Sequence, residues 1–84
     1  MPMTNNEIEN KVNAFLIDRL EIEEKYIYPK ANLKADLGLT SLDMQEMKIY
    51  CKRTFGFLPD RQDIAQLNVL EDVYVYIENK LSWE

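Results

Sequence analysis

The sequence contains no histidine and a single cysteine among its 84 residues. These absences exclude His-assisted nucleophiles, Cys–His pairs and ordinary zinc sites, which need these residue types. One cysteine cannot form an internal disulfide, which favours a reducing compartment. An enzyme would have to work with carboxylates, lysines and tyrosines, in a chain that is short for enclosing a pocket around them. We therefore expect no catalytic site and no metal site.

Long apolar runs are also missing. No segment of the sequence approaches the roughly 20 apolar residues that a membrane-spanning helix needs, and residues 1–6 lack the basic-then-apolar pattern of a signal peptide. The composition is that of a folded domain, with 46% hydrophobic and 30% charged residues. We expect a cytoplasmic monomer in which residues 1–84 form one domain. This length is near the lower limit at which a domain folds without disulfides or bound metals.

Positive charge is in deficit. The chain has 10 basic and 15 acidic residues, which gives a net charge of −5. Nucleic-acid binding normally depends on a basic patch that neutralises phosphates, so we expect no nucleic-acid partner. Basic surfaces of other proteins are more plausible partners.

Glycine and proline occur at only two and three positions, and they divide the chain into helical stretches. A first helix is predicted from about Asn5 to Leu20, because Thr4 and Glu7 have capping-box spacing and apolar residues recur at the helical period. A long connection, residues 21–39, follows; connections of this length without secondary structure are uncommon and often functional. Its scattered apolar residues could pin it to a core: Ile22, Tyr26, Ile27, Leu33 and Leu37.

A second helix is predicted to begin at Thr40 or Ser41, where a hydroxyl precedes Asp43 at capping-box spacing, and to stop at Gly56. Its inward side would carry Met44, Met47, Cys51 and Phe55.

Asp60 is predicted to cap a short third helix, 61–67, and Asn68 with Glu71 to begin a fourth. The β-prone run 74–76 leaves a strand as the alternative for that stretch. The fold class expected is all-α: a small bundle of three longer helices and one short helix, with a long loop between the first two.

Residues 36–43 form a turn that delivers Ser41 to the first turn of a helix. Free backbone N–H groups and the helix dipole favour an anion there by roughly 0.3–1 kcal/mol. Gly38 allows a tight turn that leaves the serine hydroxyl accessible. Taken alone, a hydroxyl at this place is most often only a helix cap.

The surrounding sequence resembles the acyl carrier protein family over most of the chain. The matching pieces are Asp36-Leu37-Gly38, Thr40-Ser41-Leu42-Asp43, Glu46, Phe55-Gly56, Leu58-Pro59-Asp60 and Tyr76-Ile77. Each piece is weak alone; their order and separations together make a strong signal. The resemblance implies that Ser41 carries 4′-phosphopantetheine, donated from coenzyme A by a phosphopantetheinyl transferase, with Gly38, Thr40 and Leu42 around it. The terminal thiol of the arm would then carry cargo to acyl-transferring or acyl-activating enzymes.

The chain departs from the family in three respects. Thr40 stands where the family has aspartate, which weakens the assumption that a generic transferase accepts the protein. Lys48 falls near the inner face of the second helix, where the family has apolar residues, and this suggests short, polar or aminoacyl cargo. The second helix carries an excess of one positive charge instead of being strongly acidic, which predicts poor exchange with the usual fatty-acid synthesis enzymes. Partner contacts are expected at Asp43, Gln45, Glu46, Ile49, Lys52 and Arg53.

Three functions stay open on the sequence. The first is a discrete acyl carrier for a specialised lipid, polyketide or related pathway. The second is an aminoacyl or peptidyl carrier that serves an adenylating enzyme. The third is an unmodified adaptor that keeps the carrier fold and binds one partner noncovalently. Only the first two need the Ser41 hydroxyl.

Overall fold

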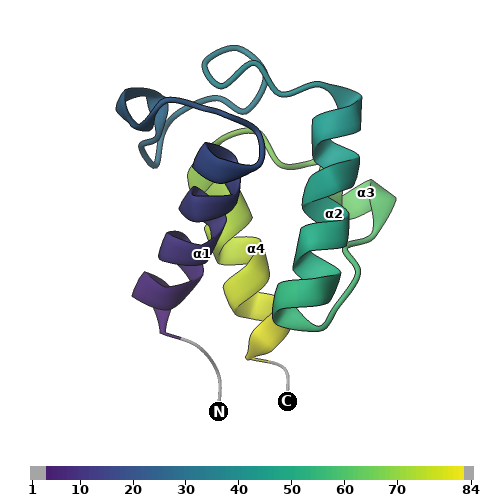
Figure 1. Ribbon diagram of the computed structural model, residues 1–84. Helices are drawn as coiled ribbons and strands as arrows, with labels where there is room; N and C mark the ends of the chain where they lie inside the picture. The colour runs from purple at the N-terminus through teal and green to yellow at the C-terminus, as the bar shows by residue number, and fades with distance from the viewer. Residues whose placement is uncertain (1–3, 83–84) are drawn as a thin grey trace.

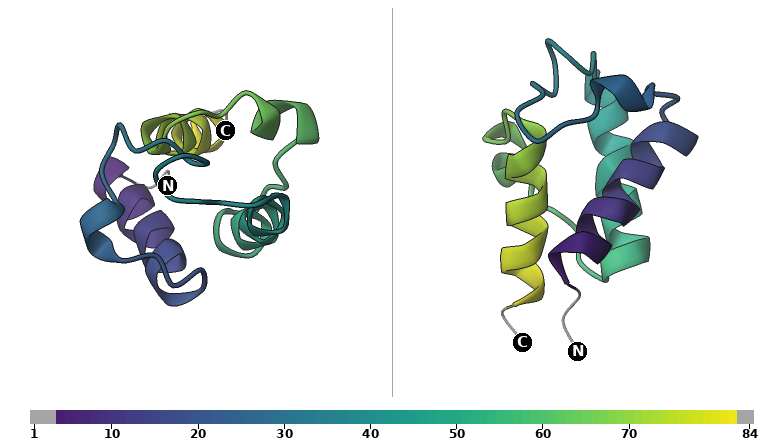
Figure 2. Two further views of the ribbon diagram at one scale, coloured as in Figure 1. Left: turned by 90° about the horizontal axis from the view of Figure 1, so that it is seen from above. Right: turned by 90° about the vertical axis from the view of Figure 1, so that its left-hand side faces the viewer.

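The computed structural model describes residues 4–82. The elements follow in the order α1 (Asn5–Asp18), a short 3₁₀ helix η1 (Glu24–Tyr26), α2 (Ser41–Phe55), α3 (Arg61–Ala65) and α4 (Leu70–Leu81). Figures 1 and 2 show α1, α2 and α4 side by side, α3 next to α2 on the side away from α1, and the long connection closing one end. The predicted bundle of three longer helices and one short helix is confirmed. Within residues 4–82, no helix is both long and apolar enough to cross a membrane.

The capping box predicted for α1 is present. The Thr4 hydroxyl accepts a hydrogen bond from the Glu7 amide at 3.2 Å, and the Glu7 carboxylate accepts one from the Thr4 amide at 3.1 Å. The Thr4 amide and hydroxyl both donate to the Glu7 carboxylate, and these bonds lower the pKa of Glu7. The helix ends at Asp18, before the predicted Leu20, because the chain turns sharply there and Glu21 adopts a left-handed φ of 58°. The predicted end at Leu20 is therefore two residues too late.

The start of α4 differs from the prediction of Asn68 with Glu71. The helix is preceded by Val69, and the Asp72 carboxylate accepts hydrogen bonds from the amides of Asn68 (3.0 Å) and Val69 (3.1 Å). These bonds lower the pKa of Asp72. Glu71 forms an exposed ion pair with Lys30 at 2.9 Å instead. The carboxylate that satisfies the free amides is thus one residue later than expected.

The run 74–76 and the short helix α3 were also predicted from the sequence. The run 74–76 is helical, so the strand alternative is wrong. The predicted cap of α3 is present, because the Asp60 carboxylate accepts a hydrogen bond from the Gln62 amide at 3.2 Å. The helix then ends at Ala65, two residues before the predicted end at Leu67.

The core combines the inner faces of α1, α2 and α4 with part of the long connection. Cys51 points inward as predicted, and burial raises the pKa of its thiol to about 12. Tyr26, which was expected to pin the connection to the core, is exposed. The buried residues of the connection are Ala31, Leu33, Leu37 and Leu39, and those of the helices are Ile8, Val12, Phe15, Leu16, Met47, Cys51, Phe55, Leu70, Val73, Tyr74 and Ile77.

The long connection is tied to the start of α4 by backbone hydrogen bonds. The Leu33 amide donates to the Asn68 carbonyl at 2.9 Å, and the Leu70 amide donates to the Ala31 carbonyl at 2.9 Å. Between them, Asn32 pairs with Val69 as an isolated antiparallel bridge. The side chains of Ala31, Leu33 and Leu70 are fully buried beneath this pairing. The connection therefore has a defined path that the sequence pattern did not show.

Three tyrosine hydroxyls link the helices to one another. Tyr50 of α2 donates to the Lys11 carbonyl of α1 at 2.8 Å, Tyr76 of α4 donates to Asp63 of α3 at 2.8 Å, and Tyr74 of α4 donates to Asn13 of α1. Buried hydroxyls are costly unless they find such partners. These contacts explain why tyrosines can occupy places close to the core.

Isoleucines inside and outside the core give a test of this packing. Ile8→Ala removes a side chain that is 1% exposed, so we expect it to lower the free energy of unfolding by about 2–5 kcal/mol. Ile49→Ala makes the same change at a position that is 52% exposed, and should change it by about 0.5 kcal/mol or less. Urea denaturation followed by circular dichroism measures both. Equal losses in the two variants would contradict the proposed core.

Candidate functional site

The turn before α2 depends on Gly38. Its φ of 67° lies in the left-handed region, which costs residues with a Cβ roughly 1–2 kcal/mol. Leu37 and Leu39 on either side are buried, and the Leu39 amide donates to the Leu33 carbonyl at 2.9 Å. The turn predicted at Gly38 is therefore present, and it is anchored in the core on both sides.

Thr40, not Ser41, caps α2. The Thr40 hydroxyl accepts a hydrogen bond from the Asp43 amide at 3.1 Å, and the Asp43 carboxylate accepts one from the Thr40 amide at 3.0 Å. Together these bonds form the predicted capping box. Asp43 was expected to contact partners, but its carboxylate is occupied in this cap.

Ser41 is the first residue of α2, and its side chain is exposed. Among residues 4–82, its hydroxyl forms no hydrogen bond, and neither do the backbone amides of Ser41 and Leu42. Leu42 is 72% exposed. The start of α2 thus presents an accessible hydroxyl beside two free N–H groups, at the positive end of the helix dipole.

A groove of about 460 Å³ opens beside Ser41. We call it the α2–α3 groove, because α2 and α3 form its two long walls and the connection closes one side. Its lining residues are Leu33, Lys34, Thr40, Ser41, Met44, Gln45, Lys48, Arg61, Ile64, Ala65 and Leu67. The half-buried Lys48 lines this groove, which agrees with its predicted place near the inner face of the second helix.

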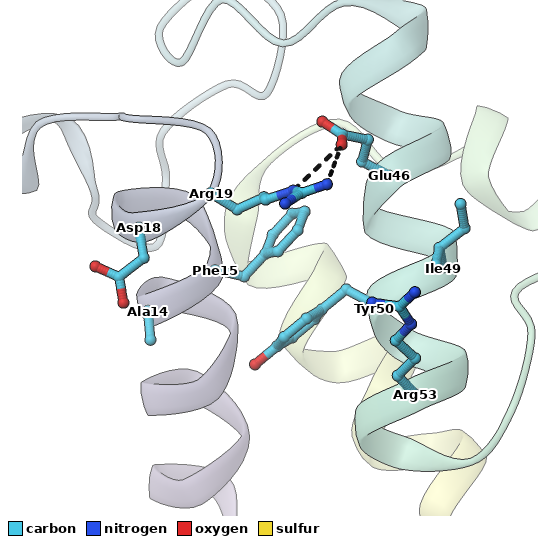
Figure 3. Close-up of a pocket in the computed structure, with 8 residues that line it drawn as sticks. All are labelled: Ala14, Phe15, Asp18, Arg19, Glu46, Ile49, Tyr50 and Arg53. Carbon is cyan, nitrogen blue, oxygen red and sulfur yellow. Dashed lines mark hydrogen bonds and ion pairs between the residues drawn. The ribbon is translucent and has the colours of Figure 1, made fainter.

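A second groove, of about 390 Å³, lies between α1 and α2, and we call it the α1–α2 groove. Figure 3 shows Arg19 reaching across it to Glu46, and the rings of Phe15 and Tyr50 lying between the two helices. The Arg19 guanidinium donates to the Glu46 carboxylate at 3.2 and 3.3 Å, and the two rings stack with centroids 4.6 Å apart. Glu46, a predicted partner contact, is therefore already paired within the chain.

The other predicted partner contacts are divided along α2. Ile49 and Arg53 line the α1–α2 groove, whereas Gln45 lines the α2–α3 groove next to Ser41. Lys52 is exposed near the end of the helix and belongs to neither groove. The structure thus does not gather the predicted partner residues into one site.

Sequence reasoning missed four charged residues of these grooves: Asp18 and Arg19 in one, and Lys34 and Arg61 in the other. Arg61 follows the Asp60 cap directly, and Lys34 lies inside the long connection. Neither position carries a local signal, because only the packing of the connection and α3 against α2 brings them near Ser41.

Known acyl carrier proteins are similar to this chain along most of its length. An acyl carrier protein of Nitratidesulfovibrio vulgaris (strain Miyazaki F) is 30% identical over 73 residues, which cover 87% of this chain and 96% of the relative. One of Thermotoga maritima is 32% identical over 75 residues, or 89% and 93% of the two chains. One of Thermosynechococcus vestitus is 32% identical over 81 residues, or 95% and 99%. The chain belongs to the acyl carrier protein family. The resemblance inferred from its motifs is thereby confirmed.

Acyl carrier proteins are carriers rather than enzymes, which agrees with the expectation that the chain is not an enzyme. No family model matches the chain. Membership of the acyl carrier protein family therefore stands on relatives that match along most of both chains, in addition to the helical fold.

The division of roles between Thr40 and Ser41 gives a test that needs no partner. Thr40→Ala removes the hydroxyl of the cap, so we expect it to lower the free energy of unfolding by about 1 kcal/mol. Ser41→Ala removes a hydroxyl without a partner in residues 4–82 and should change it by about 0.5 kcal/mol or less. Urea denaturation of both variants measures the difference. A larger loss for Ser41→Ala would mean that Ser41 is the structural hydroxyl.

Proposed function

We propose that this acyl carrier protein holds acyl intermediates as thioesters on a 4′-phosphopantetheine arm attached to the Ser41 oxygen. One observation carries the proposal: Thr40 caps α2, so the exposed Ser41 hydroxyl is not needed by the fold. Family membership adds support, because the relatives that match the chain are named acyl carrier proteins. When bound, the arm supplies a terminal thiol for the acyl group.

The residues around Ser41 fit the phosphate of such an arm. A phosphate on the Ser41 oxygen lies next to the free amides of Ser41 and Leu42, and helix N-termini favour anions through these amides and the dipole. The nearest carboxylate in sequence, Asp43, is held by the Thr40 amide. Gly38 and the buried Leu39 keep the serine at the surface. The chain's own residues would thus position the nucleophilic Ser41 oxygen and stabilise the negative charge of a phosphate attached to it.

Thr40 distinguishes this protein from family members with aspartate before the serine. Threonine caps the helix through its hydroxyl and places no carboxylate beside the phosphate, so it reduces local repulsion. A phosphopantetheinyl transferase that reads the aspartate charge loses that contact here. We therefore expect a broad-specificity transferase to be the better modifying enzyme.

The surface of α2 supports partners other than the usual fatty-acid synthesis enzymes. The helix contains three cations, Lys48, Lys52 and Arg53, and only two carboxylates. One of the carboxylates, Glu46, is neutralised by Arg19. Charge complementarity sets the specificity and the rate of protein encounters. We infer that the partners are acyl-transferring or acyl-activating enzymes of a specialised lipid, polyketide or related cytoplasmic pathway, with a less basic docking surface, and that the protein meets them as a monomer.

Intact-mass spectrometry tests the attachment. After co-expression with a broad-specificity transferase, we expect the protein to gain the mass of one phosphopantetheine group. Ser41→Ala should gain nothing. Ser82→Ala is the matched control, because Ser82 is the only other serine in the sequence, and it should be modified like the unchanged protein. An unmodified protein would contradict the proposal and favour the adaptor alternative, and modification that persists in Ser41→Ala would contradict attachment at Ser41.

Charge reversal tests the partner surface. We expect low kcat/KM for the modified protein with enzymes of fatty-acid synthesis, and we expect Arg53→Glu to raise it by about ten-fold at low salt, because opposite charges speed encounter. Lys25→Glu changes the net charge equally from within η1 and should have little effect. Steady-state assays at two ionic strengths measure this. Normal turnover of the unchanged protein would refute the inference.

A further inference from the structure

The α2–α3 groove has an uneven distribution of charge. Three cations line it: Lys34 from the connection, Lys48 from α2 and Arg61 from α3. No carboxylate is among its lining residues, and no ion pair joins any of these cations to a carboxylate within residues 4–82. The groove is thus positive although the chain as a whole is negative.

The carboxylates near the groove are committed elsewhere. Asp36 accepts a hydrogen bond from the Asn32 amide at 2.7 Å, Asp43 from the Thr40 amide at 3.0 Å, and Asp60 from the Gln62 amide at 3.2 Å. Asp63 of α3 accepts the Tyr76 hydroxyl at 2.8 Å and lies 3.9 Å from Lys80. These carboxylates take part in caps, turns and helix contacts, and none of them forms an ion pair with a groove cation within residues 4–82.

The groove begins at Ser41 and extends along α2 to Lys48, so an arm on Ser41 that folds back against α2 would bring its cargo into it. Ser41, Met44 and Lys48 are spaced three and four residues apart, so they share one face of α2, and Lys48 lies about 10 Å along the helix axis from Ser41. Apolar side chains also line the groove, among them Met44, Ile64 and Leu67. Cargo in the groove would therefore contact both apolar side chains and the half-buried Lys48 ammonium group.

We propose that the α2–α3 groove binds short acyl cargo that ends in an anionic group, such as the monothioester of a dicarboxylic acid. The proposal rests on the proposed attachment of cargo through Ser41. The methylenes of the cargo contact Met44 and Ile64, and its terminal carboxylate meets Lys48, with Lys34 and Arg61 at the rim.

The same charges discriminate against other cargo. An aminoacyl group brings an ammonium ion into a groove that already holds three cations, and like charges repel. A neutral aliphatic chain leaves the half-buried Lys48 without a counter-charge, which is unfavourable for a partly desolvated ammonium. Specificity of this kind comes from repulsion as well as attraction.

Three cargos of equal length test the proposal. The protein is loaded at Ser41 with glutaryl, pentanoyl or 4-aminobutanoyl arms, each joined to the arm by an amide in place of the thioester so that it neither hydrolyses nor cyclises. They differ only in a terminal carboxylate, methyl or ammonium group. The phosphate of the arm is common to all three, so an effect of the phosphate alone appears equally in each.

We expect nuclear Overhauser contacts from the glutaryl methylenes to Met44 and Ile64, with amide shift changes at Lys48, and much weaker effects for the other two cargos. The pKa of the glutaryl carboxyl should fall by about 0.5 unit relative to the free arm, because nearby cations favour the ionised form. Lys34→Gln/Lys48→Gln/Arg61→Gln should abolish both signals, and Lys48→Gln alone should weaken them. Lys11→Gln/Lys25→Gln/Lys30→Gln removes three cations outside the groove and should preserve them.

Equal or stronger contacts with pentanoyl or 4-aminobutanoyl cargo would overturn the proposal, as would an unshifted carboxyl pKa. Failure of the attachment itself is seen separately, as absence of the mass gain.

A second experiment applies if the attachment fails. Ser41→Cys is then alkylated with maleimides that end in a carboxylate or a methyl group. Cys51 is buried and its thiol pKa is about 12, so alkylation is confined to position 41. The same preference for the carboxylate is expected, and its absence would again overturn the proposal.

Discussion

The pairing of the long connection with the start of α4 is the constraint on which the position of the candidate site depends. Backbone bonds join Leu33 to Asn68 and Leu70 to Ala31, and the apolar side chains beneath them are fully buried, which removes apolar surface from water. From this anchor the chain reaches Leu37 and Leu39, which are also buried, so little freedom remains before Thr40. The connection therefore fixes the position of the start of α2, and residues of the connection, α2 and α3 line the groove beside Ser41.

At the start of α2 the structural and chemical tasks are divided between adjacent residues. Thr40 and Asp43 satisfy each other's amides in the capping box, and Ser41 is left accessible. The two grooves that flank α2 then differ in charge. Arg19 and Glu46 neutralise each other in the α1–α2 groove. The charged residues that line the α2–α3 groove are all cations. The single helix α2 thus separates a groove with paired charges from a candidate cargo groove whose cations are unpaired within residues 4–82.

Local signals predicted most of the helices. Thr4 with Glu7, Thr40 with Asp43, and Asp60 each start a helix where expected, since a cap depends on residues within one turn. The errors occur where distant contacts decide. At α4 the Asp72 carboxylate, not Glu71, satisfies the first amides, because Glu71 is paired with Lys30 and the chain before it is held by the connection. Tyr26, which was expected inside, is exposed because η1 turns it toward solvent.

The sequence by itself determined the all-α class, the hydroxyl cap before α2, the exclusion of histidine chemistry and the resemblance that points to Ser41, since these depend on composition and on residues close together in the chain. Only the tertiary structure decided that Glu46 is already paired with Arg19 and that Lys34, Lys48 and Arg61 meet in one groove beside Ser41. Their proximity follows from the packing of the connection and α3 against α2. Contacts between residues so far apart in sequence leave no periodic or spacing pattern, because they depend on how whole elements pack together.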